Sequence, residues 1–295
     1  CGAHGIRILG IEREGESLQV TKVAAGPSAA EIHEFVAAHL ENLEDARLAY
    51  GLGPGDFLTA CIPREEDMDD DDVRDQLRWE IERKIISNIN DYSTDYSLIG
   101  DVGFVFAGRK KLISFLNNAN PSPVCIDVEP VAVLNGCEAA DDFGQDSVLL
   151  VSIEAEGVSS IVLTNGILQA IDSFPIDENE NTPILAGQSR KALEGLQIAE
   201  DDRIVHDIFS SIERITSLGA NGENPTPERI VLSGPGAYSE RINTLLKDKY
   251  SIPFGVSDPF SKFTNNAGDI SPELAGLSAA YTSCLGLALR AMETD

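Results

Sequence analysis

Residues 148–174 read VLLVSIEAEGVSSIVLTNGILQAIDSF. The stretch holds three runs rich in β-branched and aliphatic side chains, Val148–Ile153, Val158–Leu163 and Ile167–Phe174. Asn165-Gly166 separates the last two runs, and this dipeptide is a favoured two-residue turn of a β-hairpin. The stretch therefore predicts three consecutive strands that open a structural unit.

The N-terminus opens in the same way. Runs from Arg7 to Arg13 and from Ser17 to Ala24 flank Glu14-Gly15-Glu16 and predict a second β-hairpin. Helical and strand patterns alternate after each hairpin, which indicates an α/β fold present in two copies. The polar, acidic segment 138–146 is the expected boundary, so we place lobe one at 1–142 and lobe two at 143–295. A cleft between two such lobes is a common ligand site.

Periodicity and turn residues predict the remaining elements. A helix at about 29–49 should end before Gly51, and a helix at about 69–86 should bury Val73, Leu77, Ile81 and Ile85. The other expected elements of lobe one are strands at 57–62, 96–99, 103–107 and 124–128 and helices at 109–118 and 129–140. Those of lobe two are helices at 182–196, 202–218, 237–249 and 273–292 and strands at 229–232 and 253–256.

The composition excludes several classes of function. The 295 residues carry 49 acids against 22 bases, a formal net charge of −27. This argues against binding nucleic acid or anionic lipid through a broad surface and favours basic partners. We find no run of about 18 apolar residues, so we expect no direct membrane insertion. The chain begins with Cys1, which we interpret as a trimmed start, with a lipidated cysteine as the alternative.

The residues that usually hold metals or act as nucleophiles form no recognisable motif. The five cysteines include no C-x-x-C pair, the four histidines have no H-E-x-x-H spacing, and G-x-S-x-G is absent. We therefore expect no metal site, no disulfide framework and no hydrolase triad.

Five landmarks in the same order resemble the type IV pilus assembly protein PilM family of the actin-like ATPase superfamily. The resemblance covers most of the chain. The landmarks are Glu80–Ile85 followed by Asp95-Tyr96 (family pattern EIEKYIPF…DY), Ile126–Pro130 (DVEP), Ile230–Gly234 (LSGG), Ile252–Val256 with Asp258–Phe260 (IPV…NPF) and Leu285–Arg290 (GLALR).

The resemblance implies a two-lobed actin-like fold, of the duplicated ribonuclease H-like type. It also implies a small α/β subdomain inserted in lobe one at roughly 27–120 and a shortened outer subdomain in lobe two. Its partner would be the cytoplasmic tail of a PilN-like inner-membrane pilus protein. The chain would then be cytoplasmic and peripheral to the inner membrane, with self-association left open. A GspL-like cytoplasmic domain of a type II secretion system is an alternative.

The resemblance also identifies the positions where the superfamily holds ATP. The first phosphate turn corresponds to Gly10–Gln19, where Glu12 replaces an aspartate and Gln19 replaces a lysine. The turn itself carries Glu14 and Glu16 on either side of Gly15. The second corresponds to Val151–Gly157, where Ser152 replaces an aspartate and Glu154 a glycine, with Gly157 closing the turn. The adenosine-side turn is Ser233-Gly234-Pro235-Gly236, in which Pro235 removes one backbone donor.

All three turns depart from the family pattern in a direction that disfavours phosphate. A carboxylate a few ångströms from a triphosphate costs about 1–4 kcal/mol. We therefore expect a degenerate site, no catalytic residue, and ATP with magnesium only if the variant site works. An active actin-like ATPase stays open as an alternative, as do a metal held by Glu12, Glu14 and Glu154 and a set of exposed turn carboxylates with no role.

The resemblance places an extended partner peptide in a groove between the inserted subdomain and lobe one. We expect the helix at 69–86 and the strand near Phe104–Ala107 to lie beside this groove. The net charge favours a basic tail. Arg78 and Arg83 on the helix are expected to pair with neighbouring acids rather than with the tail.

Overall fold

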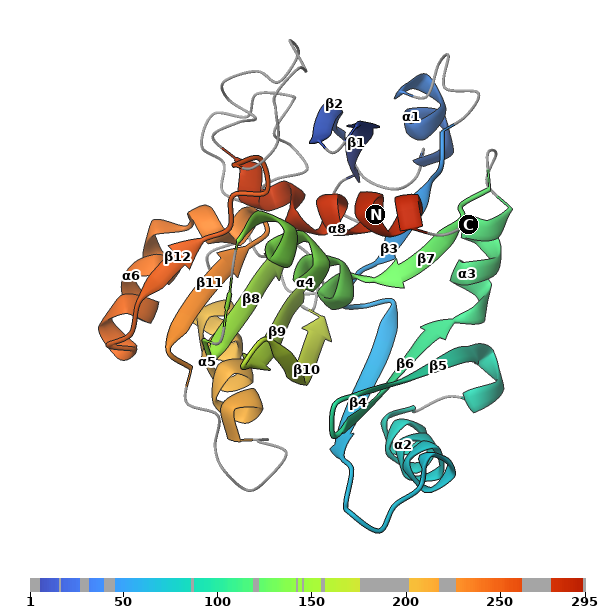
Figure 1. Cartoon of the computed structure of the whole chain (residues 1–295), viewed down its shortest axis with the longest axis vertical. Coiled ribbons are helices and arrows are strands. Elements are labelled where there is room, and N and C mark those ends of the chain that lie inside the picture. The colour runs from blue at the N-terminus through green and yellow to red at the C-terminus, as the bar shows by residue number, and fades with distance from the viewer. Residues whose placement is uncertain are drawn as a thin grey trace.

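A computed structural model describes residues 6–15, 17–26, 32–39, 46–85, 88–118, 122–141, 143–144, 146–154, 157–175, 202–217, 227–261 and 277–293. Two α/β lobes lie side by side, with the C-terminal helix running between them and a further small α/β unit attached to lobe one (Figure 1). Among these residues, no helix is long and apolar enough to cross a membrane.

Lobe two is built on a five-stranded sheet of order β10-β9-β8-β11-β12. Strands β8, β9 and β10 are antiparallel, whereas β11 runs parallel to both β8 and β12. The bounds are β8 (Val148–Glu154), β9 (Gly157–Thr164), β10 (Ile167–Pro175), α5 (Asp202–Ser217), β11 (Arg229–Ser233), η4 (Pro235–Tyr238), α6 (Glu240–Lys249) and β12 (Phe254–Val256).

The turn between β9 and β10 forms as the sequence predicts. Asn165 and Gly166 both adopt positive φ, at 54° and 72°, as a type I′ turn requires. The three strands predicted from residues 148–174 are therefore confirmed.

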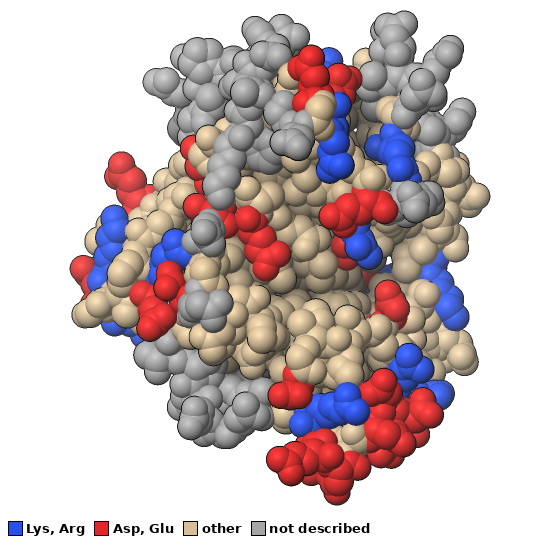
Figure 2. Space-filling view, in the orientation of Figure 1, with Lys and Arg blue, Asp and Glu red and all other residues tan. Residues whose placement is uncertain are grey.

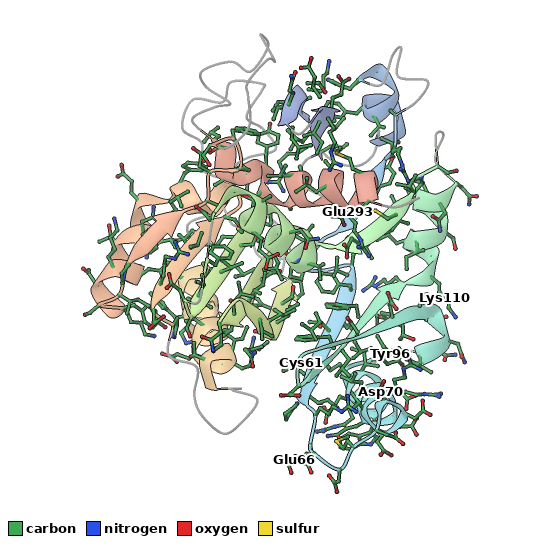
Figure 3. All side chains as sticks on the ribbon, in the orientation of Figure 1. Cys61, Glu66, Asp70, Tyr96, Lys110 and Glu293 are labelled. Atoms are coloured by element: carbon green, nitrogen blue, oxygen red, sulfur yellow. The ribbon has the colours of Figure 1, made fainter. Side chains whose placement is uncertain are left out.

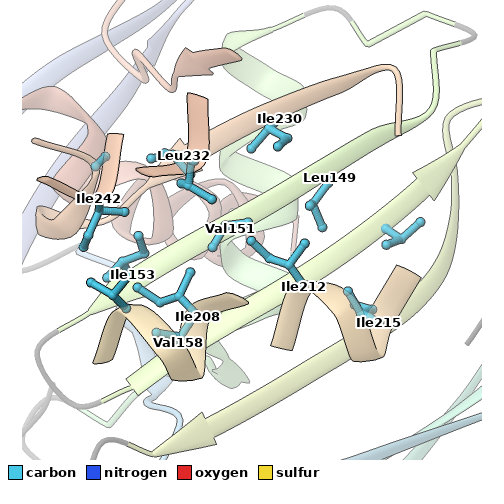
Figure 4. Packing of buried hydrophobic residues seen from close by; sticks show 14 of the residues in the cluster. Leu149, Val151, Ile153, Val158, Ile208, Ile212, Ile215, Ile230, Leu232 and Ile242 are labelled. Atoms are coloured by element: carbon cyan, nitrogen blue, oxygen red, sulfur yellow. The ribbon is translucent and has the colours of Figure 1, made fainter. Parts of the chain in front are cut away.

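Strand β8 is buried on both faces and forms the centre of the core. Leu149, Val151 and Ile153 pack toward Ile208 and Ile212 of α5 (Figure 4). Val148 and Leu150 on the opposite face belong to a second cluster, which contains Val133 and Cys137 of a lobe-one helix. A strand covered by helices on both faces reads as a continuous apolar run, which explains the sequence VLLVSI.

Lobe one begins with the antiparallel hairpin of β1 (Ile6–Glu14) and β2 (Ser17–Gly26), followed by α1 (Ile32–His39). Strand β3 (Ala49–Leu52) pairs in parallel with β7 (Cys125–Val128), and α4 (Glu129–Ala140) follows β7. The C-terminal segment η5 (Ser278–Tyr281) leads into α8 (Thr282–Glu293), which packs along α4. Gly286 permits this close approach, because a Cβ there would overlap the backbone of Ala132.

The attached unit, here called the inserted subdomain, comprises β4 (Phe57–Pro63), α2 (Asp70–Lys84), η2 (Ile89–Asp91), β5 (Tyr92–Ile99), β6 (Val102–Arg109) and α3 (Lys110–Asn117). Its sheet has the order β4-β6-β5, so β6 is the central strand. Helix α2 buries Val73, Leu77 and Ile81 against the sheet. Asp69 caps α2 by accepting hydrogen bonds from the backbone of Asp71 and Asp72.

Three sequence predictions need correction. Residues 49–52 are strand β3 rather than the end of a helix, because Tyr50 and Leu52 are buried in the pairing with β7. The final helix begins at Thr282 rather than near 273, since Leu277 has a non-helical backbone and 278–281 form a 3-10 turn. Ile85 lies beyond the end of α2 in extended conformation and is only half-buried.

Four other predictions stay untested. The helix at 182–196 falls outside the described residues, and so do residues 273–276 of the last helix. The lobe boundary at 142/143 and the limits of the insertion, 27–120, remain predictions. Strand β3 lies inside the predicted insertion, whereas its partner β7 lies after the predicted C-terminal limit.

Candidate functional site

Five charged or hydroxyl side chains meet at the junction of the two lobes. Arg7 comes from β1 and Glu129 from the first residue of α4 in lobe one. Ser152 and Glu154 come from β8 and Ser159 from β9 in lobe two. All are buried or nearly so, so they form an internal polar cluster within an otherwise apolar interface.

An ion pair joins the lobes at the centre of this cluster. Nη2 of Arg7 lies 2.6 Å from Oε2 of Glu154, and the two side chains retain only 16% and 11% of their exposure. Burial, the largest influence, lowers the pKa of Arg7, but Glu154, Cys284 and Tyr281 together outweigh it and the pKa is raised. Arg7 is therefore held in its charged form. Removing either partner would leave a buried, uncompensated charge.

Glu129 is a second buried carboxylate beside this pair. Its Oε2 accepts a hydrogen bond from Oγ of Ser159 at 2.6 Å, and Ser159 lies 3.1 Å from Ser173 on β10. Burial, followed by the nearby negative charge of Glu154, raises the pKa of Glu129 to about 7. Ser152, Ser159 and Arg7 oppose this shift only in part.

The first phosphate turn is an exposed hairpin tip. Gly15 adopts φ 65° in open space, and Glu12 and Glu14 are exposed. Glu14 accepts a hydrogen bond from the side-chain amide of Gln19, the residue that stands where the family has lysine. Glu16 lies outside the described residues. The structure thus places two of the predicted carboxylates in solvent, away from the buried cluster.

The second phosphate turn is occupied by protein groups. Glu154 faces Arg7, and Ser152 lies fully buried beside Glu129. A Cβ at Gly157 would overlap the carbonyl oxygen of Phe174 and approach Pro54 of lobe one to 2.5 Å. The absence of a side chain at Gly157 therefore allows the loop between β3 and β4, which contains Pro54, to pack closely onto β9.

The adenosine-side turn is buried beneath η5. Ser233, Gly234 and Gly236 are all buried, and Gly234 has φ 77°. The Gly234 amide donates to the carbonyl of Ala279 at 2.9 Å, and the Ala279 amide donates to the hydroxyl of Tyr238 at 2.8 Å. The backbone of this turn therefore contacts the chain's own C-terminal segment.

The predicted site residues thus lie at three separate positions in the structure. Of the predicted residues, Ser152 and Glu154 belong to the buried cluster that joins the lobes. Sequence reasoning missed Arg7 and Glu129 as site residues. The available signals were an arginine within an apolar strand and a glutamate just before Pro130 at a helix start. Among the described residues, no group of three potential ligands is placed to hold a metal ion.

The two elements that the sequence analysis placed beside the peptide groove are α2 and β6 of the inserted subdomain. Strand β6, which contains Phe104–Ala107, is the buried centre of its sheet and offers no free edge, and its place beside a groove stays a prediction. Arg78 pairs with Glu82 at 2.9 Å and Arg83 with Glu80 at 3.5 Å, which confirms their expected pairing with neighbouring acids.

Comparison with known proteins supports the fold assignment. No family model and no curated protein matches the chain. A chain of a PilM-PilN type IV pilus biogenesis complex superposes with a TM-score of 0.71 and 20% identity, over 99% of this chain and 97% of that one. The predicted two-lobed actin-like fold is confirmed, and so is the resemblance to the PilM family at the level of the fold.

Two further solved structures are more distant. One is a Bacteroides thetaiotaomicron protein with an actin-like ATPase fold and unknown function, with TM-score 0.46, 11% identity, and coverage of 88% of this chain and 92% of that one. The other is the cytoplasmic domain of EpsL, an inner-membrane component of the type II secretion system of Vibrio cholerae. Its TM-score is 0.40 at 11% identity, with coverage of 58% and 66%.

Proposed function

We propose that this chain is a cytoplasmic scaffold of type IV pilus assembly that binds the cytoplasmic tail of a PilN-like inner-membrane partner. The observation that carries the proposal is the full-length structural similarity to a chain of a PilM-PilN complex. The chain would reach the inner membrane through that partner.

We further propose that the nucleotide site is degenerate. The residues present fit a triphosphate with magnesium poorly, because the carboxylate of Glu154 lies at the second turn and is held there by Arg7. Glu129 adds a second acid in the same cluster. The adenosine-side turn is covered by η5. No step of a hydrolysis reaction is therefore assigned to these residues.

The tail-binding role is tested by pull-down. The cytoplasmic tail of the PilN-like inner-membrane protein encoded next to this chain would be immobilised as a synthetic peptide. The full chain would then be applied at increasing salt concentrations. We expect retention that weakens steeply with salt, since a chain of net charge −27 favours a basic tail. Absence of retention at low salt would contradict the scaffold proposal.

A further inference from the structure

The inserted subdomain has one sheet edge that pairs with no other strand of the described structure. Its other edge strand, β4, packs toward β10 of lobe two, and Cys61 of β4 lies on the side that faces lobe two (Figure 3). Strand β5 forms the outer edge. Its pairing with β6 runs without a bulge from Tyr92 opposite Arg109 to Ile99 opposite Val102, so the edge is regular over eight residues.

The register shows which backbone groups of β5 point outward. Gly100 and Asp101 form a two-residue turn, with Gly100 at φ 58°. Such a hairpin closes on a hydrogen-bonded pair, here Ile99 and Val102, and hydrogen-bonded pairs then alternate along the ladder. The groups that face outward are therefore those of Tyr92, Thr94, Tyr96 and Leu98.

Two observed hydrogen bonds agree with this assignment. The Tyr92 amide donates to the carbonyl of Ile89, and the Tyr96 amide donates to the carboxylate of Asp95 at 2.9 Å. Both amides thus find acceptors outside the β5–β6 ladder. Thr94 and Leu98 remain as the outward positions at which an added strand could pair.

This edge carries one charged side chain, Asp95, and lacks three other devices that prevent strand addition. Edge strands are commonly protected by lysine, proline or a bulge. Between Lys84 and Arg109 the sequence contains no Lys, Arg or Pro. The hairpin end also exposes Leu98 and Ile99, at 38% and 36%, beside the exposed Ile167 of lobe two.

The charges around the edge indicate the kind of strand it would accept. Asp91, Asp95 and Asp101 accompany β5. Acidic side chains also gather at the start of α2 (Figure 2), the helix that packs on β4 and β6 of the same sheet. A second copy of this chain is a poor occupant. Antiparallel pairing centred on Asp95 would set two aspartates opposite each other, and each chain carries a net charge of −27.

We propose that the outer edge of β5 binds an extended basic segment of another protein, which adds to the β4-β6-β5 sheet as a fourth strand. Backbone hydrogen bonds would provide affinity, and lysine or arginine side chains would meet the aspartates. This surface is separate from the tail-binding proposal, because it is the free outer edge of β5, whereas the tail is expected in the groove between the inserted subdomain and lobe one.

The probe is a fluorescein-labelled peptide of sequence Lys-Val-Lys-Thr-Lys-Val-Lys-Thr, measured by fluorescence anisotropy at low salt. Its controls are two peptides of the same sequence that are N-methylated at alternate backbone amides. One is methylated at the odd-numbered amides and the other at the even-numbered amides, so each blocks hydrogen bonding along one edge of the added strand. We expect saturable binding that only one of the two methylated peptides loses, because only one edge of the added strand faces β5. No saturable binding at millimolar peptide, or equal binding by all three peptides, would overturn the proposal.

Protein variants test the same edge. Thr94→Pro removes an outward amide without removing a β5–β6 hydrogen bond, and Thr94→Val is its control. Asp95→Lys and Asp248→Lys change the net charge equally, but Asp248 lies on α6. We expect Thr94→Pro and Asp95→Lys each to weaken binding by about tenfold or more, from lost hydrogen bonding and lost attraction, and both controls to bind like the parent chain. Equal weakening by Asp95→Lys and Asp248→Lys would show that binding depends only on the net charge of the chain, and would contradict a binding site at β5.

Amide hydrogen exchange provides a readout that does not depend on variants. In the free chain the amides of Thr94 and Leu98 should exchange fast, whereas those of Ser93, Asp95 and Ser97 should be protected by β6. Peptide should slow the first two. Protection of Thr94 and Leu98 in the free chain would show that the edge is already covered.

Discussion

Arg7 and Glu154 are 147 residues apart in the chain and form an ion pair 2.6 Å long between β1 and β8. The pair connects the first strand of lobe one to the strand that precedes the second phosphate turn. It therefore joins the two lobes at the position where the resemblance predicts a phosphate turn.

Replacing one partner of the ion pair should destabilise the chain more than replacing both partners. Arg7→Met or Glu154→Leu alone should lower the free energy of unfolding by about 3–5 kcal/mol, because each leaves a buried charge unpaired. The double variant Arg7→Met/Glu154→Leu should recover most of that loss. Urea denaturation of the four chains gives the coupling. Single variants within about 0.5 kcal/mol of the parent would show that the pair is solvated.

Glu129 should make stability depend on pH. Its folded pKa, about 7, lies above the ordinary value of 4.5, so the folded chain holds this proton more tightly than the unfolded chain. Between pH 4.5 and 7 this group therefore destabilises the fold progressively as pH rises, and above pH 7 the loss is complete.

Glu129→Gln removes that titration. We expect the stability of the variant relative to the parent to rise across pH 4.5–7 and then level off, as measured by urea denaturation at a series of pH values. Glu12→Gln, which removes an exposed carboxylate, is the control. A difference curve for Glu129→Gln that is flat with pH, or that falls, would contradict the buried position of this carboxylate.

The contact between α4 and α8 should not tolerate a methyl group. Gly286→Ala would place a Cβ on the backbone of Ala132 and should destabilise the chain by about 1–3 kcal/mol or more. Gly255→Ala on β12 is the matched control, since a Cβ there meets nothing within 4 Å. Equal thermal midpoints for the two variants would show that the helices lie farther apart.

The inserted subdomain should depend on the buried face of α2. Leu77 is 1% exposed, and Leu77→Ala should cost about 2–5 kcal/mol. Trp79 is 56% exposed and contacts Arg83 of the same helix through its ring, so Trp79→Ala should cost less than about 1 kcal/mol. The reverse order in urea denaturation would show that α2 presents its other face to the sheet.

The sequence predicted what depends on local pattern. Asn165-Gly166 predicts its turn because few dipeptides adopt positive φ twice, and the spacing of Val73, Leu77 and Ile81 reports one helix face. Strand β3 was missed because four residues carry little periodic signal and the strand forms only by pairing with β7.

The candidate site was harder to predict for the same reason. The resemblance located the turns and identified Ser152 and Glu154. It did not reveal that Glu154 faces Arg7 or that Glu129 lies beside them, since those contacts bring together residues 7, 129 and 154 through the tertiary fold. The exposure of Glu12 and Glu14 likewise follows from the position of the first hairpin.

The central claim is that the actin-like fold is used here without nucleotide, and calorimetric titration of the purified chain with ATP and magnesium tests it most directly. We predict no saturable heat up to millimolar ATP, because Glu154 and Glu129 place negative charge where phosphate would lie. Saturable binding at micromolar ATP would contradict the account and favour an active ATPase.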